Sequence, residues 1–149
     1  MRDRLAALLL AACVVLTCGG DGAVEPPWVE IRGQRVSLEL AVTRSEQQKG
    51  LGERDSLAWD RGMLFRYERA GFYGFWMKGM RFDIDIVWLR DGRIVDISHD
   101  VRHVPAGSPL PTYQPRELVD TVLEVPSGYV RAHGWRVGDH AAWDLAQPG

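Results

Sequence analysis

The stretch from Phe82 to Ser98 constrains the fold more than any other part of the sequence. Phe82–Leu89 alternates strictly, with Phe, Ile, Ile and Trp on one face of a strand and Asp, Asp, Val and Leu on the other. Asp91-Gly92 follows, and this dipeptide favours a two-residue type I′ turn because both positions accept a positive φ. Since Arg93–Ser98 can supply the return strand, the sequence predicts an antiparallel hairpin.

A second alternating stretch lies near the N-terminus. From Trp28 to Val42, apolar and polar residues alternate on either side of Gly33-Gln34, so we expect another hairpin here. Ser45–Lys49 is predicted to form a short helix, because Thr43 and Glu46 have the spacing of a capping box. A glycine directly after this segment supplies the stop signal.

The remaining sequence consists of short extended segments. Strands are expected at residues 63–65, 75–78, 122–125 and 140–145, and a single helical turn at residues 127–133. Residues 104–116 contain four prolines, so we expect an exposed loop rather than a strand inside a sheet. Many short strands with one or two short helices predict a mostly β or α+β fold, a small antiparallel domain of barrel or sandwich type.

The N-terminus has the pattern of a signal sequence over residues 1–17. Arg2 and Arg4 form a positive start, and Leu5–Leu16 is an apolar run too short for a bilayer, which needs about 20 residues. We expect a flexible tether over residues 18–27 and one domain over residues 28–149. The domain is therefore predicted to be exported, to the periplasm or the outer cell surface.

Both cysteines of the chain, Cys13 and Cys18, lie in or beside this leader. Bacterial lipoprotein signals place a small residue before the cysteine that is lipidated. Cys18 is the preferred site because it closes the apolar run and precedes a Gly-rich segment, whereas Cys13, which follows Ala11-Ala12, is the alternative. Cleavage without lipid is also left open. An acylated cysteine would attach the domain to a membrane surface.

The charge pattern argues against a nucleic-acid partner. The chain has 149 residues and a formal net charge of −2, and its lysines and arginines are scattered without a basic run. Six tryptophans are many for this length, and we interpret them first as large side chains of a small β core. No cofactor-binding motif is evident, so no cofactor is predicted.

Several motifs in fixed order resemble a known family. They are Gly62-Met63-Leu64-Phe65, Phe75-Trp76-Met77-Lys78, Asp85-Ile86 and Val122-Leu123-Glu124. In these motifs the chain is similar to the family called domain of unknown function 192, over roughly residues 36–143. The resemblance implies a small β-rich domain, often exported by bacteria and archaea, with no agreed activity. The chain departs from the family pattern at Gly52, Gly79-Met80 and Asp83.

One group of candidate site residues combines an aromatic side chain with charges. Trp76 and Lys78 are expected on one face of their strand, with Phe75 and Met77 on the other, in the core. An aromatic surface beside cations suits an anionic or sugar-like ligand. The predicted shallow binding site consists of Arg54, Trp76, Lys78, Asp85 and Glu124.

A second group consists of acids on the predicted hairpin. With Asp91-Gly92 as the turn, Val87 lies opposite Asp96, so Asp83, Asp85 and Asp96 share a face. Three carboxylates on one face could bind a divalent cation or take part in acid–base catalysis. Acids on a solvated strand face are also common without a function, and an ion pair between Lys78 and Asp85 is the simpler interpretation.

A copper site is a further alternative, in which Met63, Met77 and Met80 join His99 and His103. Methionine is an ordinary core residue, so we do not favour it. The sequence favours a non-enzymatic binding or accessory domain of the cell envelope, for a small anionic or sugar-like ligand. The alternative is a metal-dependent or acid–base enzyme, resembling a hydrolase, that uses Asp83, Asp85 and Asp96.

Overall fold

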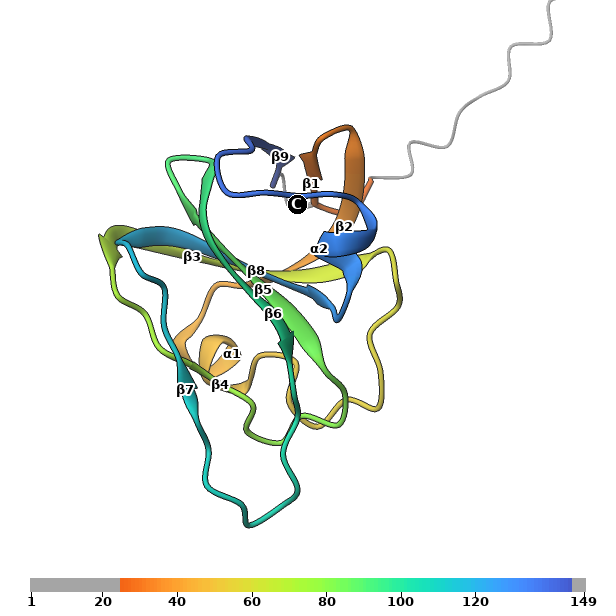
Figure 1. The fold of residues 1–149 in the computed structure, drawn as a ribbon, viewed down its shortest axis with the longest axis vertical. Helices are drawn as coiled ribbons and strands as arrows, with labels where there is room; N and C mark the ends of the chain where they lie inside the picture. Colours follow the sequence, from red (N-terminus) through yellow and green to blue (C-terminus); the bar gives the residue numbers. More distant parts are fainter. Residues whose placement is uncertain (1–24, 146–149) are drawn as a thin grey trace, which may run out of the picture.

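The computed structural model describes residues 25–145, which form a strongly curved sheet and two short helices (Figure 1). The predicted signal sequence and both Cys13 and Cys18 lie outside the described residues. The strands are β1 (Trp28–Ile31), β2 (Gln34–Ala41), β3 (Arg61–Gly71), β4 (Phe75–Trp76), β5 (Ile84–Arg90), β6 (Arg93–Val101), β7 (Thr112–Tyr113), β8 (Val119–Pro126) and β9 (Ala141–Asp144). The helices are α1 (Arg44–Lys49) and α2 (Tyr129–Ala132).

Seven strands form one sheet in the order β6-β5-β8-β3-β2-β1-β9, while β4 and β7 form a separate pair. The pair β2–β3 is parallel and the other pairs are antiparallel. The sheet curls until an isolated bridge joins Arg93, at the start of β6, to His140, just before β9. The predicted β-rich, barrel-like fold class is confirmed, but the prediction of an antiparallel domain is wrong for the parallel pair β2–β3.

The sheet carries a hydrophobic core on each of its two faces. On one face, Val87 and Leu89 pack with Tyr129 and Val130 of α2 and with Trp135. On the other face, Ile86 and Trp88 pack with residues of β3 and with the segment around β4; this second core includes Phe65, Phe75, Met77 and Met80. The alternation of β5 occurs as predicted, and it divides the side chains between two cores, which the sequence did not indicate.

The hairpin of β5 and β6 has the predicted turn but not the predicted register. Asp91 and Gly92 have φ values of 49° and 74°, as a type I′ turn requires. Leu89 pairs with Ile94, but the register then shifts, so Asp96 pairs with Trp88 rather than with Val87. This β-bulge gives β6 one extra residue, so the side chains of residues 96–98 lie on the face opposite to the predicted one. A second register shift follows between Ile84 and Ile86.

The short helix α1 begins as the sequence predicts. The Glu46 backbone N–H donates to Oγ1 of Thr43 at 3.2 Å, and the Thr43 N–H donates to Oε2 of Glu46 at 2.7 Å. These reciprocal bonds form the expected capping box and lower the pKa of Glu46, chiefly through the Thr43 N–H bond. The helix ends at Gly50, whose φ of 50° favours glycine. The cap thus fixes where the side chains of α1 point.

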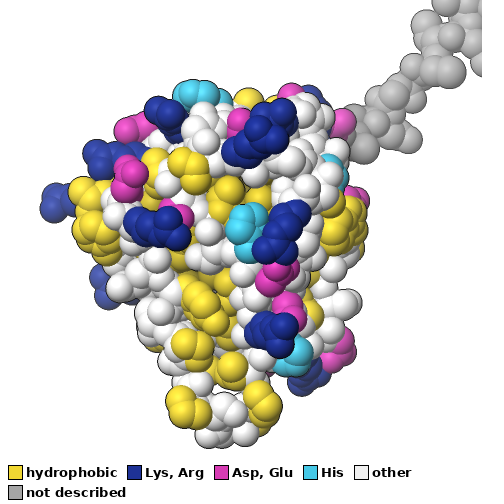
Figure 2. All heavy atoms as spheres, viewed as in Figure 1, with side chains coloured by type: hydrophobic (Ala, Val, Ile, Leu, Met, Phe, Trp, Pro, Cys, Tyr) yellow, Lys and Arg dark blue, Asp and Glu magenta, His cyan; other side chains and the backbone are white. Residues whose placement is uncertain are grey.

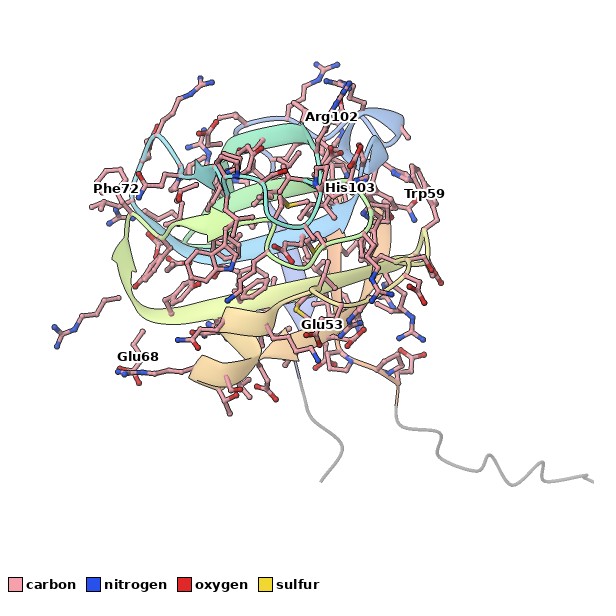
Figure 3. The ribbon with its side chains drawn as sticks, turned by 90° about the horizontal axis from the view of Figure 1, so that it is seen from below. Glu53, Trp59, Glu68, Phe72, Arg102 and His103 are labelled. Atoms are coloured by element: carbon pink, nitrogen blue, oxygen red, sulfur yellow. The ribbon has the colours of Figure 1, made fainter. Side chains whose placement is uncertain are left out.

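The exposed aromatic side chains do not form one large patch. Trp59 and Phe72 precede and follow β3, and they lie at opposite ends of the molecule (Figure 3). On the face shown in Figure 2, lysine and arginine side chains are mixed with acidic ones, and hydrophobic side chains gather over the loop between β6 and β7. Within the described part of the chain, no helix is both long and apolar enough to cross a membrane.

Candidate functional site

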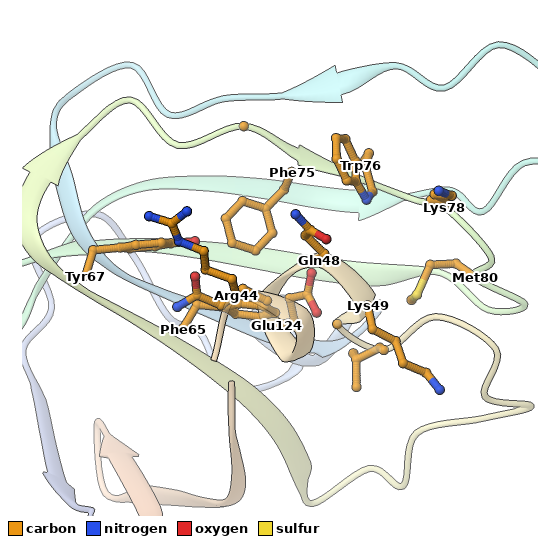
Figure 4. Close-up of a pocket in the computed structure, with 14 residues that line it drawn as sticks. Arg44, Gln48, Lys49, Phe65, Tyr67, Phe75, Trp76, Lys78, Met80 and Glu124 are labelled. Carbon is orange, nitrogen blue, oxygen red and sulfur yellow. The ribbon is translucent and has the colours of Figure 1, made fainter. Parts of the chain in front are cut away.

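A pocket of about 220 Å³ lies between α1, the segment around β4 and the face of the sheet that carries the second core (Figure 4). Its wall contains the aromatic side chains of Phe65, Tyr67, Phe75 and Trp76. Its polar lining residues are Arg44, Gln47, Gln48, Lys49, Lys78 and Glu124. The pocket therefore combines an aromatic wall, several cations and one carboxyl group, a mixture that suits small-molecule binding.

The aromatic wall is positioned by the alternation of the β4 segment. Phe75 and Met77 are buried, with 8% and 1% of their surface exposed, whereas Trp76 is 47% exposed. The Phe75 ring is held edge-on to Phe65, with ring centroids 4.8 Å apart, and to Trp88, at 5.4 Å. This packing fixes β4 so that Trp76 projects from the core, and the predicted division of these side chains is confirmed.

Glu124 is the polar residue placed deepest in the pocket. It lies in the middle of β8, where Met63 of β3 and Ile86 of β5 are its neighbours in register. Only 5% of Glu124 is exposed, and its Oε2 atom has no hydrogen-bond partner among residues 25–145. Three buried side-chain polar atoms in this range have no partner, and of the three residues that carry them only Glu124 lines the pocket. Figure 4 shows the carboxyl group between α1 and the strand that carries Phe75.

Burial changes the acidity of Glu124. Removal from water raises the pKa of this carboxyl group to about 8, and the charge of Arg54 opposes the change without cancelling it. At neutral pH the group therefore keeps its proton and can donate a hydrogen bond. Burial likewise raises the pKa of Tyr67 in the pocket wall to about 12, so this phenol is also neutral.

The end of α1 closes the pocket directly over Glu124. A Cβ atom on Gly50 would lie 3.5 Å from Cζ of Phe65 and 3.9 Å from Oε2 of Glu124. Arg44, Gln47 and Gln48 all line the pocket, because positions three and four residues apart share one face of a helix. The sequence reasoning missed these residues and Tyr67. The helical spacing and the position of Tyr67, two residues after Phe65 on β3, were the signals available.

Arg54 lies beside the pocket rather than in it. Its guanidinium donates to both carboxylate oxygens of Glu39, at 2.6 and 2.7 Å, and this bidentate pair lowers the pKa of Glu39. Arg54 contributes charge to Glu124 but does not line the pocket. The structure therefore brings Trp76, Lys78 and Glu124 together, but it leaves Arg54 in an adjacent surface ion pair.

Asp85 is separated from this pocket by the sheet. It is fully buried on the opposite face, where Oδ1 accepts the Asp100 N–H at 2.9 Å and Oδ2 accepts the Val130 N–H at 3.0 Å. Within the described chain, no ion pair joins Asp85 to Lys78, so the simple interpretation of these two residues was wrong. Asp85 instead holds β6 and α2 against β5.

The three acids expected to share a face are separated. Asp83 accepts hydrogen bonds from the backbone N–H and the ring Nδ1 of His103, at 2.9 and 2.6 Å. These bonds lower the pKa of Asp83, even though partial burial acts in the opposite direction. Asp96 accepts backbone N–H bonds from Ile97 and Arg116, at 2.9 and 3.0 Å. The bulge in β6 removes Asp96 from the face of Asp85, so the predicted acidic cluster was wrong.

The methionines considered as copper ligands pack in the second core. Met63, Met77 and Met80 are buried there, with 5%, 1% and 7% of their surfaces exposed. Residues 25–145 contain no group of three or more His, Cys, Asp or Glu side chains placed to hold a metal ion. The methionines are thus accounted for as core residues.

A second hollow lies beside the pocket, between residues 77–81 and the loop at residues 103–110. It is larger, about 680 Å³, and mostly apolar. Of the residues that line it in the described structure, none has a buried polar atom without a partner. The buried carboxyl group of Glu124 therefore distinguishes the first pocket from this second hollow.

The sequence and the fold agree with the resemblance stated above. Residues 28–143 match the model of domain of unknown function 192, described as an uncharacterised ACR. The chain belongs to this family. No curated protein matches this DUF192 chain.

Crystal structures of similar fold come from two bacteria. One is of a provisionally assigned transcription regulator from Sinorhizobium meliloti, with 30% identity, a TM-score of 0.69, and coverage of 78% of this chain and 92% of that chain. The other is of a protein of unknown function from Novosphingobium aromaticivorans, with 28% identity, a TM-score of 0.68, and coverage of 78% and 84%. Both are similar to this DUF192 domain over most of their length.

Proposed function

We propose that this domain binds a small anionic or sugar-like molecule in the pocket formed by α1, β4 and β8, without catalysing a reaction. The observation that carries the proposal is the carboxyl group of Glu124, a residue that lines the pocket and whose buried Oε2 has no partner among residues 25–145. A buried polar atom without a hydrogen bond is costly, so a ligand that satisfies it gains affinity. The half-exposed Trp76 supplies a flat surface against which a ring can pack.

The composition of the pocket supports binding rather than catalysis. Glu124 is its only acid among the described residues, and its lining contains neither serine nor cysteine. A catalytic acid–base pair of carboxyl groups would need a second acid close by. The proposal therefore assigns the pocket a binding role.

A screen of the full chain against metabolites and glycans, read by thermal unfolding, tests this function. A ligand at about 100 times its Kd stabilises a protein by about 3 kcal/mol, which gives a clear rise in Tm. Trp76→Ala and Lys78→Ala are expected to abolish the rise while leaving the fold intact. Trp59→Ala is the matched control, because Trp59 is 50% exposed but does not line the pocket. An equal loss in the control variant contradicts the proposed site.

We also propose that the domain works outside the cytoplasm, held on a membrane by a lipid on Cys18, with Cys13 as the alternative. The support is the charged and apolar pattern of the leader and the position of both cysteines within it. Intact mass of the protein purified from membranes tests this proposal. An N-terminal peptide starting at Cys18 with acyl chains is expected, and an unmodified N-terminus would contradict it.

A further inference from the structure

The surroundings of Glu124 indicate which chemical group its carboxyl group would meet. Its neighbours on β3 and β5, Met63 and Ile86, are apolar and offer no polar side chain. Over it, Gly50 at the end of α1 has no side chain at all. Oε2 therefore has no hydrogen-bond partner in the described protein, and its residue lines the pocket.

Apart from Glu124, the ionisable side chains of the described residues that line the pocket and are charged at pH 7 are all cations. Arg44 and Lys49 come from α1, and Lys78 comes from the segment after β4. Lys49 pairs with Glu53 at 3.0 Å and Arg54 with Glu39 at 2.6 Å, but Arg44 and Lys78 form no ion pair within residues 25–145. The pocket therefore has positive charge without a matching anion, while its deepest acid is neutral at pH 7.

We infer that the pocket takes a compact oxyanion, a carboxylate or phosphate group that accepts a hydrogen bond from the Glu124 carboxyl group and is balanced by Arg44 and Lys78. The rest of the ligand packs against Phe75 and Trp76. This inference rests on the proposed function and narrows it. A cationic ligand would be repelled by Arg44 and Lys78, and a neutral polyol would leave both charges unused.

Probes that share one ring test the chemistry of the ligand. At about pH 6.5 we expect the full chain to bind benzoate or phenyl phosphate at least about tenfold more tightly than benzyl alcohol, a difference of about 1.4 kcal/mol in binding free energy. We expect no binding of benzylammonium. NMR titration or calorimetry gives the Kd values. A preference for benzoate indicates a carboxylate ligand, and a preference for phenyl phosphate a phosphate ligand. Equal affinity for benzyl alcohol overturns the inference.

The pH dependence of benzoate binding gives a second readout. Below about pH 8 the affinity is expected to be flat, and above it to fall by up to about tenfold per pH unit as Glu124 loses its proton. Glu124→Gln keeps a donor that does not titrate, so it should bind benzoate within about threefold of the wild type, with no decline near pH 8. The other titratable groups, Arg44, Lys49, Lys78 and Tyr67 in the lining and Arg54 beside the pocket, are present in both proteins. The same decline in both proteins overturns the inference.

Failure of this inference can be told apart from failure of the proposed function. If neutral probes bind as tightly as oxyanions, and Trp76→Ala removes that binding, the pocket binds ligands but the oxyanion assignment is wrong. If neither the probes nor the screened metabolites and glycans bind, both proposals are wrong. Glu124→Leu adds a further check, because it lacks any donor and should lose oxyanion binding. Should that variant not fold, Glu124→Gln still decides the question.

Discussion

Asp85 and Glu124 are two buried acids that lie side by side in the sheet but face opposite ways. Asp85 pairs with Val125 and Glu124 with Ile86, so the two acids are adjacent in register on β5 and β8. Both oxygens of Asp85 accept backbone N–H groups, whereas Oε2 of Glu124 has no partner among residues 25–145. The same chemical group thus holds structural elements together on one face and lies without a hydrogen-bond partner, beside a pocket, on the other.

The largest loss of stability should come from removing Asp85, the buried acid whose two oxygens both accept hydrogen bonds. Asp85→Ala leaves the N–H groups of Asp100 and Val130 buried without an acceptor. Each such group costs about 1–3 kcal/mol, so we expect the free energy of unfolding to fall by about 4 kcal/mol. Urea unfolding measures the loss. Asp83→Ala, at a more exposed acid, is the control and should cost much less. Similar losses at both positions would remove the structural role given to Asp85.

The next effect concerns the pH dependence of stability. The pKa of Glu124 is about 8 in the folded chain but near the ordinary 4.5 in the unfolded chain. Between these values the unfolded chain binds fewer protons, so wild-type stability falls as pH rises, by about 1.4 kcal/mol per pH unit from this group alone. Glu124→Gln should remove this contribution. Unfolding of both proteins between about pH 5 and pH 8 measures the difference. Parallel pH profiles would mean that Glu124 ionises normally.

A smaller effect should be confined to the face with the pocket. A Cβ atom on Gly52 would lie 2.8 Å from the Lys78 carbonyl oxygen and 2.9 Å from that of Lys49. Because both atoms are backbone, Gly52→Ala must displace the pocket edge, at a cost of about 2 kcal/mol. Hydrogen exchange should speed up around α1 and β4, but not at the Asp100 and Val130 amides. Faster exchange at those two amides would show that the two faces do not respond separately.

The smallest effect on stability is expected at Arg54. Its ion pair with Glu39 is substantially exposed, with 35% and 43% of the side chains accessible, so Arg54→Met should cost less than about 1 kcal/mol. Loss of this cation should raise the pKa of Glu124 further, since Arg54 is the charge that lowers it. An NMR titration of the Glu124 carboxyl carbon measures this change. Arg54→Lys keeps the charge and should show a much smaller rise, and no rise in the Met variant would exclude coupling.

The local elements of the fold follow from the sequence, but their arrangement does not. The β5–β6 turn and the capping box of α1 depend on neighbouring residues, and both occur as predicted. The bulge next to Trp88 depends on one extra residue in β6, which no alternation pattern shows in advance. The parallel pairing of β2 with β3 depends on contacts between distant segments. Elements that depend on neighbouring residues could therefore be predicted from the sequence, whereas strand pairing between distant segments could not.

The same distinction applies to the site. Trp76, Lys78 and Glu124 were predicted together, and all three line the pocket. Asp85 was wrongly grouped with them, because the sequence does not show whether side chains from distant strands lie on the same face of a sheet. Arg54 was included for its charge. In the structure, however, both terminal nitrogens of its guanidinium donate hydrogen bonds to the carboxylate of Glu39. Residues on one strand or helix can thus be grouped from spacing, whereas grouping across strands needs the register.

The position of β8 in the sheet also bears on how the chain folds. β8 lies between β3 and β5, so the strands on either side of it have no direct pairing to each other. The hairpin of β5 and β6 depends on local pairing, but it joins strands β1–β3 only through residues 119–126, which lie between them in the sheet. Because non-local pairing is slow in general, we expect closure of the sheet around β8 to be the slow step of folding. Glu124 lies on that strand, so its desolvation belongs to the final assembly of the domain.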